Sequence, residues 1–356
     1  MLFQMRSVVM INCGATIDIT QLFPPTVTTY IIDNSRPFNL ENLLPQHTNV
    51  CVFDDAADTE RLDLLIDAHG SMEYDSDSDS SASDTNDEDE FGRVQSDRPR
   101  QRRRLNSPTA VEQRMQKQEK MRELVKYHDV PAYQGYSSAA IAYLLATDLA
   151  QTNNNLLWWA IVGVTAQYVF EHIDTDKYLE HVSMLSDEVA RLNVGDDDAM
   201  AEGSIRTEDE YKFMLFRHWN LYDSMIHSPY ISEILALGTE AGVVRMHNML
   251  ATEGISLKQA RQQYAHMELS TKKELKKKVE SMCQLQGVDG ILYPSFSQSF
   301  GYHGRLSASD TVYSLDTLLE TRSSVALELG EDVRWDDEDG DDMGSTFYTA
   351  YDAMGR

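Results

Sequence analysis

The sequence has few cysteines and no long apolar run, and both shortages exclude classes of protein. Its three cysteines, Cys13, Cys51 and Cys283, form no CxxC pair. Neither a disulfide framework nor a cysteine-based zinc site is therefore expected, and isolated thiols are typical of a reducing compartment. The most apolar stretch, 156–164, is much shorter than the roughly 20 residues that a membrane-spanning helix needs. Because no signal peptide is visible, we expect a soluble intracellular protein without a membrane partner.

The motifs of common phosphate-binding and nucleophilic enzymes are also missing. The sequence contains no GxxxxGK[ST] loop, no GxGxxG and no GxSxG. Its 10 histidines are scattered and form no HxH or HxxxH pair, so imidazoles are not spaced to hold a divalent cation. We therefore expect no nucleotide hydrolysis and no cofactor.

Basic residues are outnumbered, since 31 Lys and Arg stand against 58 Asp and Glu and give a formal net charge of −27. Phosphate backbones repel such a chain as a whole, so contact with single-stranded DNA would need a local basic patch. One candidate is a lysine group on a predicted helix. Its members are Lys272, Lys273, Lys276 and Lys277. Alternatively, these lysines form an exposed helix face that pairs with Glu274 and Glu280.

Three short β-branched runs, 7–13, 28–33 and 50–53, predict a parallel sheet in an α/β domain, because Gly, Pro, Asn and Asp bound each run. Asn12 and Asp33 come at the C-terminal ends of the first two runs. Open α/β sheets bind ligands at these ends.

A metal-dependent phosphoesterase would need carboxylates and imidazoles at the strand ends. The residues present there are Asn12 and the run Asp33-Asn34-Ser35. These provide too few ligands for a divalent cation. The alternative role for Asp33 and Asn34 is to cap or turn the backbone at the edge of the sheet.

Composition changes abruptly at 71–108. Residues 73–90 hold nine acidic residues and five serines, and such a segment should be disordered. Ser76, Ser78 and Ser80 are phosphorylation candidates, although a solubilising linker is an equal alternative. A basic run follows that predicts nuclear import, or else a counter-charge to the acidic run. Its arginines are Arg98, Arg100, Arg102, Arg103 and Arg104.

Helical patterns dominate the rest of the chain. Ser137 or Ser138 can cap a helix, and 155–170 is apolar on most sides. Thr207 and Glu210 resemble a capping box that would begin a helix with a stripe of apolar residues. The stripe consists of Tyr211, Leu215, Trp219, Tyr222 and Ile226. It is either part of a core or a surface for a partner, where Trp and Tyr are enriched.

The expected fold class is α/β, with a partial parallel-sheet domain, a disordered acidic and basic insert and a helical insertion. The segments are a partial α/β domain at 1–70, the disordered insert at 71–108, a mostly helical continuation at 109–200, a helical partner-binding insertion at 201–290, a return to the α/β domain at 291–323 and an acidic, disordered tail at 324–356.

Several runs, in order over roughly residues 8–320, resemble the cell division control protein 45 family. The most specific run is Leu-Trp-Trp-Ala-Ile-Val-Gly at 157–163. Shorter ones are Ile-Asn-Cys-Gly-Ala at 11–15, Asp-Asn-Ser-Arg-Pro at 33–37 and His-Trp-Asn-Leu-Tyr-Asp-Ser at 218–224. In that family, the first strand seen here would be internal, and most of a C-terminal α/β domain would follow. The resemblance therefore implies an unpaired sheet edge.

This family is similar to the DHH phosphoesterases, including RecJ-type single-strand exonucleases, and is regarded as having lost catalysis. The resemblance implies a partial DHH-like domain in which Asp33-Asn34-Ser35 occupies the Asp-His-His position. Asn12 would lie near the preceding acidic position, and Ala166 stands where many relatives have Asp. Each departure removes a ligand, which implies a degenerate site with no catalytic residue and no metal.

The resemblance also implies a nuclear scaffold subunit of the replicative helicase, acting in the initiation and elongation of DNA replication. Its implied partners are the minichromosome maintenance ring and the GINS complex, contacted through a helical insertion at about 205–285. Single-stranded DNA and origin chromatin are secondary partners. The alternative is a manganese-dependent phosphoesterase or single-strand exonuclease of the DHH type.

Overall fold

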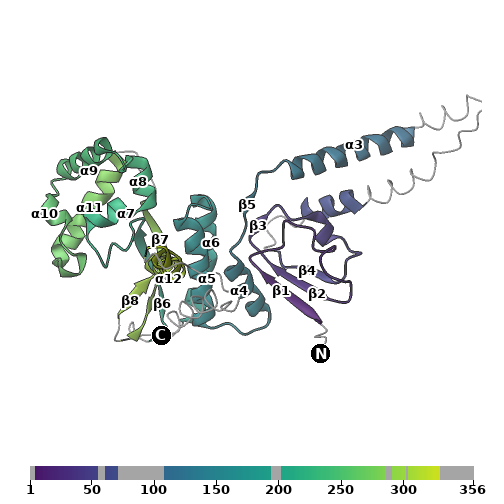
Figure 1. Cartoon of the computed structure of the whole chain (residues 1–356), viewed down its shortest axis with the longest axis horizontal. Helices are drawn as coiled ribbons and strands as arrows, with labels where there is room; N and C mark the ends of the chain where they lie inside the picture. Colours follow the sequence, from purple (N-terminus) through teal and green to yellow (C-terminus); the bar gives the residue numbers. More distant parts are fainter. Residues whose placement is uncertain are drawn as a thin grey trace, which may run out of the picture. The chain divides into compact units, whose positions relative to one another are not determined.

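A computed structural model describes residues 5–54, 61–70, 108–193, 202–285, 291–301 and 304–328. The fold is mixed α/β and divides into two compact units, Met1–Ala142 and Tyr143–Arg356 (Figure 1). Within the described ranges, no helix is both long and apolar enough to cross a membrane.

The first unit is built on a small parallel sheet, which confirms the three predicted strands. Strands β1 (Ser7–Ile11), β2 (Thr28–Ile32) and β4 (Val50–Val52) lie in the order β1-β2-β4. Ile31 and Val50 face a core that also contains Ala15, Ile19 and Phe38. The turns after β1 and β2 thus fold back over one face of the sheet.

The other face of this sheet is open at its edge strand. Val9 and Ile11 on β1 are 58% and 67% exposed, and Cys51 on β4 is exposed too. Among the described residues, β1 pairs only with β2. Parallel sheets usually have both faces covered, so this apolar face is unusual for a folded domain.

Helical and irregular segments complete the first unit (Figure 1). The two-residue strands β3 (Ser35–Arg36) and β5 (Tyr133–Gln134) pair antiparallel. Helix α3 (Pro108–His128) packs beside the helix at 61–70 and the 3-10 turn η1 (Leu40–Leu43). The contact is made by Leu124, Leu65 and Leu40. The Ser137 hydroxyl accepts a bond from Ala140 N at 3.2 Å and so caps α4 (Ser138–Asp148).

The second unit contains an antiparallel sheet of β6 (Ile205–Tyr211), β7 (Leu292–Ser299) and β8 (Arg305–Ser307), in that order. Helices α5 (Asn154–Val169), α6 (Thr175–Leu192) and α12 (Ala308–Glu328) pack against it (Figure 1). The predicted apolar segment is α5, which is buried on most sides. Stacked rings of Tyr168 and Tyr178, with centroids 4.1 Å apart, join α5 to α6.

The predicted helix that begins at Thr207 and Glu210 is wrong, because 205–211 is strand β6. The capping-box pattern is local, whereas β6 takes its backbone bonds from β7, far along the chain. The apolar stripe therefore does not lie on one helix. Leu215 has a φ of 49° in the connection at 212–220, and only the later part of the stripe lies in a helix.

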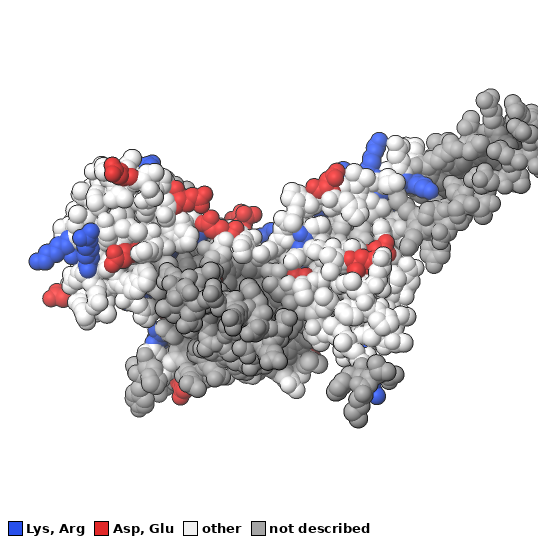
Figure 2. All heavy atoms as spheres, viewed as in Figure 1, with Lys and Arg blue, Asp and Glu red and all other residues white. Residues whose placement is uncertain are grey.

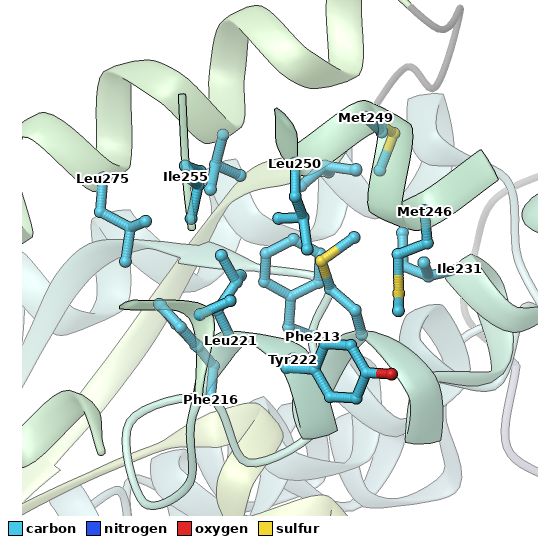
Figure 3. Close-up of a cluster of buried hydrophobic side chains, with 14 of the residues drawn as sticks. Phe213, Phe216, Leu221, Tyr222, Ile231, Met246, Met249, Leu250, Ile255 and Leu275 are labelled. Carbon is cyan, nitrogen blue, oxygen red and sulfur yellow. The ribbon is translucent and has the colours of Figure 1, made fainter. Parts of the chain in front are cut away.

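A helical subdomain, residues 213–285, follows β6. Its helices are α7 (Leu221–His227), α8 (Pro229–Leu235), α9 (Glu240–Thr252), α10 (Leu257–Ala260) and α11 (Leu269–Leu285), with the 3-10 turn η2 (Tyr264–His266) before α11. Phe213, Leu221 and Met246 meet in its core (Figure 3). A capping box of Ser256 and Gln259 begins α10.

Gly242 sets the close approach of α9 to the end of α8. A Cβ at this position would lie 2.1 Å from the carbonyl oxygen of Ala236 and 2.5 Å from that of Leu235. We expect Gly242→Ala to lower the free energy of unfolding by about 1–3 kcal/mol, as overpacking does. Chemical denaturation measures this. Gly238→Ala is the matched control, since a Cβ there meets nothing within 4 Å; an equal loss in both variants would contradict the steric reason.

The open face of β1 should cause self-association. We expect the double change Val9→Lys and Ile11→Lys to remove it, because exposed apolar patches drive association and both side chains already face solvent. Light scattering over a concentration series measures the effect. Ser7→Lys is the control, since it adds charge to the same strand without removing an apolar group. A wild-type chain that stays monomeric throughout would refute this prediction.

Candidate functional site

The strand ends of the parallel sheet bring Asp33 and Asn12 to the position where ligands bind in open α/β sheets. Asp33 is buried, and both of its carboxylate oxygens accept bonds from backbone amides. Oδ2 accepts from Ala15 N at 3.0 Å, and Oδ1 accepts from Ser35 N at 3.0 Å. The Arg36 guanidinium donates to the Asp33 carbonyl at 2.8 Å. The carboxylate therefore fastens together the two turns that follow β1 and β2.

Asn12 and Asn34 are also engaged by the protein itself. Asn12 has a φ of 58°, and its backbone N donates to Ile32 O at 2.8 Å. Its side-chain oxygen accepts from the Ser138 hydroxyl at 2.9 Å, which links the strand end to the start of α4. The Asn34 side-chain amide donates to Gln134 at 3.2 Å. These contacts match the alternative in which Asp33 and Asn34 shape the backbone.

The side chains around this edge are poorly suited to bind a metal cation. Over the ranges that the structure describes, no three His, Cys, Asp or Glu residues lie close enough together to hold a metal ion. Ser35 contributes its backbone to β3. Ala166 lies on α5 in the second unit and is half-buried. The contacts described at this edge support turn geometry.

The apolar stripe proposed as a partner surface belongs largely to the core of the helical subdomain. Tyr222 is buried, and Tyr211 and Ile226 pack against the core cluster (Figure 3). Leu215 and Trp219 are half-buried in the connection at 212–220. The stripe therefore does not form one continuous exposed surface.

The lysines lie on α11. Lys273, Lys276 and Lys277 are exposed, and Lys276 lies 3.6 Å from the Asp209 carboxylate. Lys272 sits over the ring of Tyr264, 4.7 Å from its centroid. Figure 2 shows Lys and Arg side chains grouped over the part of the subdomain that holds α10 and α11. A basic patch is thus present on a chain that is acidic overall.

The phosphorylation candidates Ser76, Ser78 and Ser80 and the arginines Arg98 to Arg104 lie outside the described residues. The same is true of nearly all of the acidic tail.

The second unit contains a buried charged cluster that sequence patterns do not predict. Glu210 on β6 and Asp310 in the first turn of α12 are both buried, and His218 Nε2 lies 3.3 Å from Asp310 Oδ2. Arg217 Nε lies 3.9 Å from Glu210 Oε1. Burial, and then the charge of Asp310, raise the pKa of Glu210 to about 7. In the sequence, Glu210 predicts a helix cap and not a buried residue of a strand.

Comparison with known proteins agrees with the sequence resemblance. A family model described as CDC45 matches residues 3–97 and 71–356. The Cell division control protein 45 homolog of Schizosaccharomyces pombe is 34% identical over 351 residues, covering 90% of this chain and 55% of the relative. The Homo sapiens homolog is 29% identical over 332 residues, covering 89% and 56%. The chain spans about half the length of these relatives.

A solved structure has the same fold. The crystal structure of CDC45 from Entamoeba histolytica matches with a TM-score of 0.64 at 20% identity, covering 99% of this chain and 54% of that one. The fold agrees over nearly the whole chain, and the family model matches both sides of the acidic insert. The chain belongs to the CDC45 family, whose members are DNA replication proteins.

Proposed function

We propose that the chain acts in DNA replication as a non-catalytic scaffold subunit of the replicative helicase. The observation that supports this most is the buried Asp33 carboxylate, both of whose oxygens accept backbone amides. In this arrangement the carboxylate holds two turns together, while the neighbouring Asn34 and Ser35 are poor ligands for a divalent cation. The chain would then contribute binding free energy and geometry to its assembly.

The proposed partners are the minichromosome maintenance ring and the GINS complex, with the helical subdomain as the main contact. This subdomain exposes apolar side chains on several of its helices, among them Val244 on α9 and Leu269 on α11. Exposed apolar groups beside charged ones are typical of protein interfaces. The α11 lysines form a secondary surface for single-stranded DNA or origin chromatin.

The nucleus is the proposed location, with Arg98 to Arg104 as the import signal and Ser76, Ser78 and Ser80 as sites of phosphorylation. A basic run beside acidic serines fits both roles by composition. The site at the strand ends is proposed to be a degenerate form of the DHH phosphoesterase site.

Hydrolysis should be absent. We expect the purified chain with manganese to digest a single-stranded oligonucleotide no faster than the same mixture with a chelator, because Asn34 and Ser35, beside Asp33, are poor ligands. Gel analysis of the oligonucleotide measures this. Chelator-sensitive digestion that Asp33→Asn abolishes would instead establish the exonuclease alternative.

Partner binding should depend on the exposed apolar residues of the helical subdomain. We expect Val244→Asp to weaken retention by immobilised GINS and ring proteins by about tenfold, the effect of roughly 1.4 kcal/mol at an interface. Titrated pull-downs measure this. Leu149→Asp is the matched control, because Leu149 is 65% exposed, compared with 55% for Val244, but lies just after α4, outside the helical subdomain. Failure of the wild-type chain to bind either partner would contradict the scaffold proposal.

A further inference from the structure

Four charged side chains meet where the connection at 212–220 passes the sheet of the second unit. Glu210 comes from β6, Arg217 and His218 from the connection, and Asp310 from α12. His218 Nε2 lies 3.3 Å from Asp310 Oδ2, and Arg217 Nε lies 3.9 Å from Glu210 Oε1. Arg217 also reaches Glu208 at 3.2 Å. The connection is thereby tied to two different elements by charge.

The two carboxylates are almost fully buried, while the histidine is partly exposed to solvent. The side chains of Glu210 and Asp310 are 6% and 4% exposed, whereas that of His218 is 48% exposed. Glu210 Oε2 is buried with no hydrogen-bond partner among the described residues. Two buried carboxylates cannot both be charged at low cost unless cations pair with them.

Among the described residues, Arg217 is the cation that acts on Glu210, and Arg305 on β8 interacts electrostatically with Arg217 and Glu208. Tyrosines face Glu210 from three elements, namely Tyr178 on α6, Tyr293 on β7 and Tyr313 on α12. The hydroxyls of Ser307 and Ser309 also act on Glu210. The pKa of each of the three tyrosines is raised, mainly by burial, so they remain neutral near pH 7. The charge state of the cluster is thus decided by Glu210, Asp310, Arg217 and His218.

The same connection leads directly into the helical subdomain. Phe213 and Phe216, which lie in this connection, are members of the subdomain core. Helix α7 begins directly after it, at Leu221. Tyr264 N donates to Trp219 O at 2.9 Å, so η2 is bonded to the connection as well. Releasing His218 and Arg217 would therefore loosen the attachment of the subdomain to the sheet.

We propose that Glu210, Asp310, Arg217 and His218 form a proton-dependent latch between the sheet and the helical subdomain. The latch holds when His218 is charged and faces the buried Asp310 carboxylate. It loosens when His218 loses its proton, because this attraction is then lost, while Arg217 keeps its ion pair with Glu208. This role is separate from the proposed scaffold function and would exist whatever the chain binds.

The direction of the pH dependence follows from the pKa of His218. The nearby Asp310 carboxylate raises this pKa above its usual value. A group whose pKa is higher in the folded state stabilises that state at low pH and loses this contribution as the pH rises through the folded value. The latch should therefore loosen as His218 loses its proton, between about pH 6 and pH 8.

Amide hydrogen exchange of the full chain, resolved by peptide mass spectrometry, tests the latch. After correction for the intrinsic rate, we expect protection of 212–227 to fall by about tenfold from pH 6 to pH 8, the equivalent of one unit of linked pKa. His218→Gln, which is neutral at every pH, should give low protection at both pH 6 and pH 8 and so lose the pH dependence. Glu208→Gln is the matched control, because Glu208 also pairs with Arg217 but is 45% exposed. It should retain the wild-type pH dependence.

Two results would overturn the latch. One is wild-type protection of 212–227 that stays equal at pH 6 and pH 8, and this measurement decides the matter even if a variant fails to fold. The other is a His218→Gln chain whose protection falls with pH as much as that of the wild type.

Discussion

A buried carboxylate at the end of a parallel strand must be fully bonded, and in the first unit this requirement shapes the whole strand-end region. Asp33 meets it with the amides of Ala15 and Ser35. The bonds hold the turn after β1 against the turn after β2, and Ala15 and Phe38 then reach the core. The carboxylate is therefore part of the packing of the two turns.

The elements that the sequence predicted correctly are those whose local pattern agrees with their long-range partners. The β-branched runs at 28–32 and 50–52 are strands by composition and also by pairing. The segment of α5 is apolar on most sides and is buried on most sides. Strand β6 is different, because its charged residues and Thr207 carry a local helix signal. Pairing with β7 outweighs that signal, and a partner so distant cannot be inferred from spacing.

The same distinction between local and long-range information applies to the candidate site. The motif at 33–35 allows two roles for Asp33 and Asn34, ligand binding or turn formation, and the contacts at the strand end agree with turn formation. The cluster of Glu210, Asp310 and His218 could not be foreseen, because β6, the connection at 212–220 and α12 meet only after folding. Its pKa shifts arise from burial, which a sequence does not report.

Lys212 has a consequence for how the second unit comes apart. Its ammonium lies 4.1 Å from the ring centroid of Tyr230 on α8, 4.6 Å from that of Tyr168 on α5 and 3.2 Å from the Glu171 carboxylate. Displacing α8 from α5 would separate the ammonium from at least one of the two rings and remove part of its cation–π attraction. Lys212 therefore couples α8 of the helical subdomain to α5, which packs on the sheet.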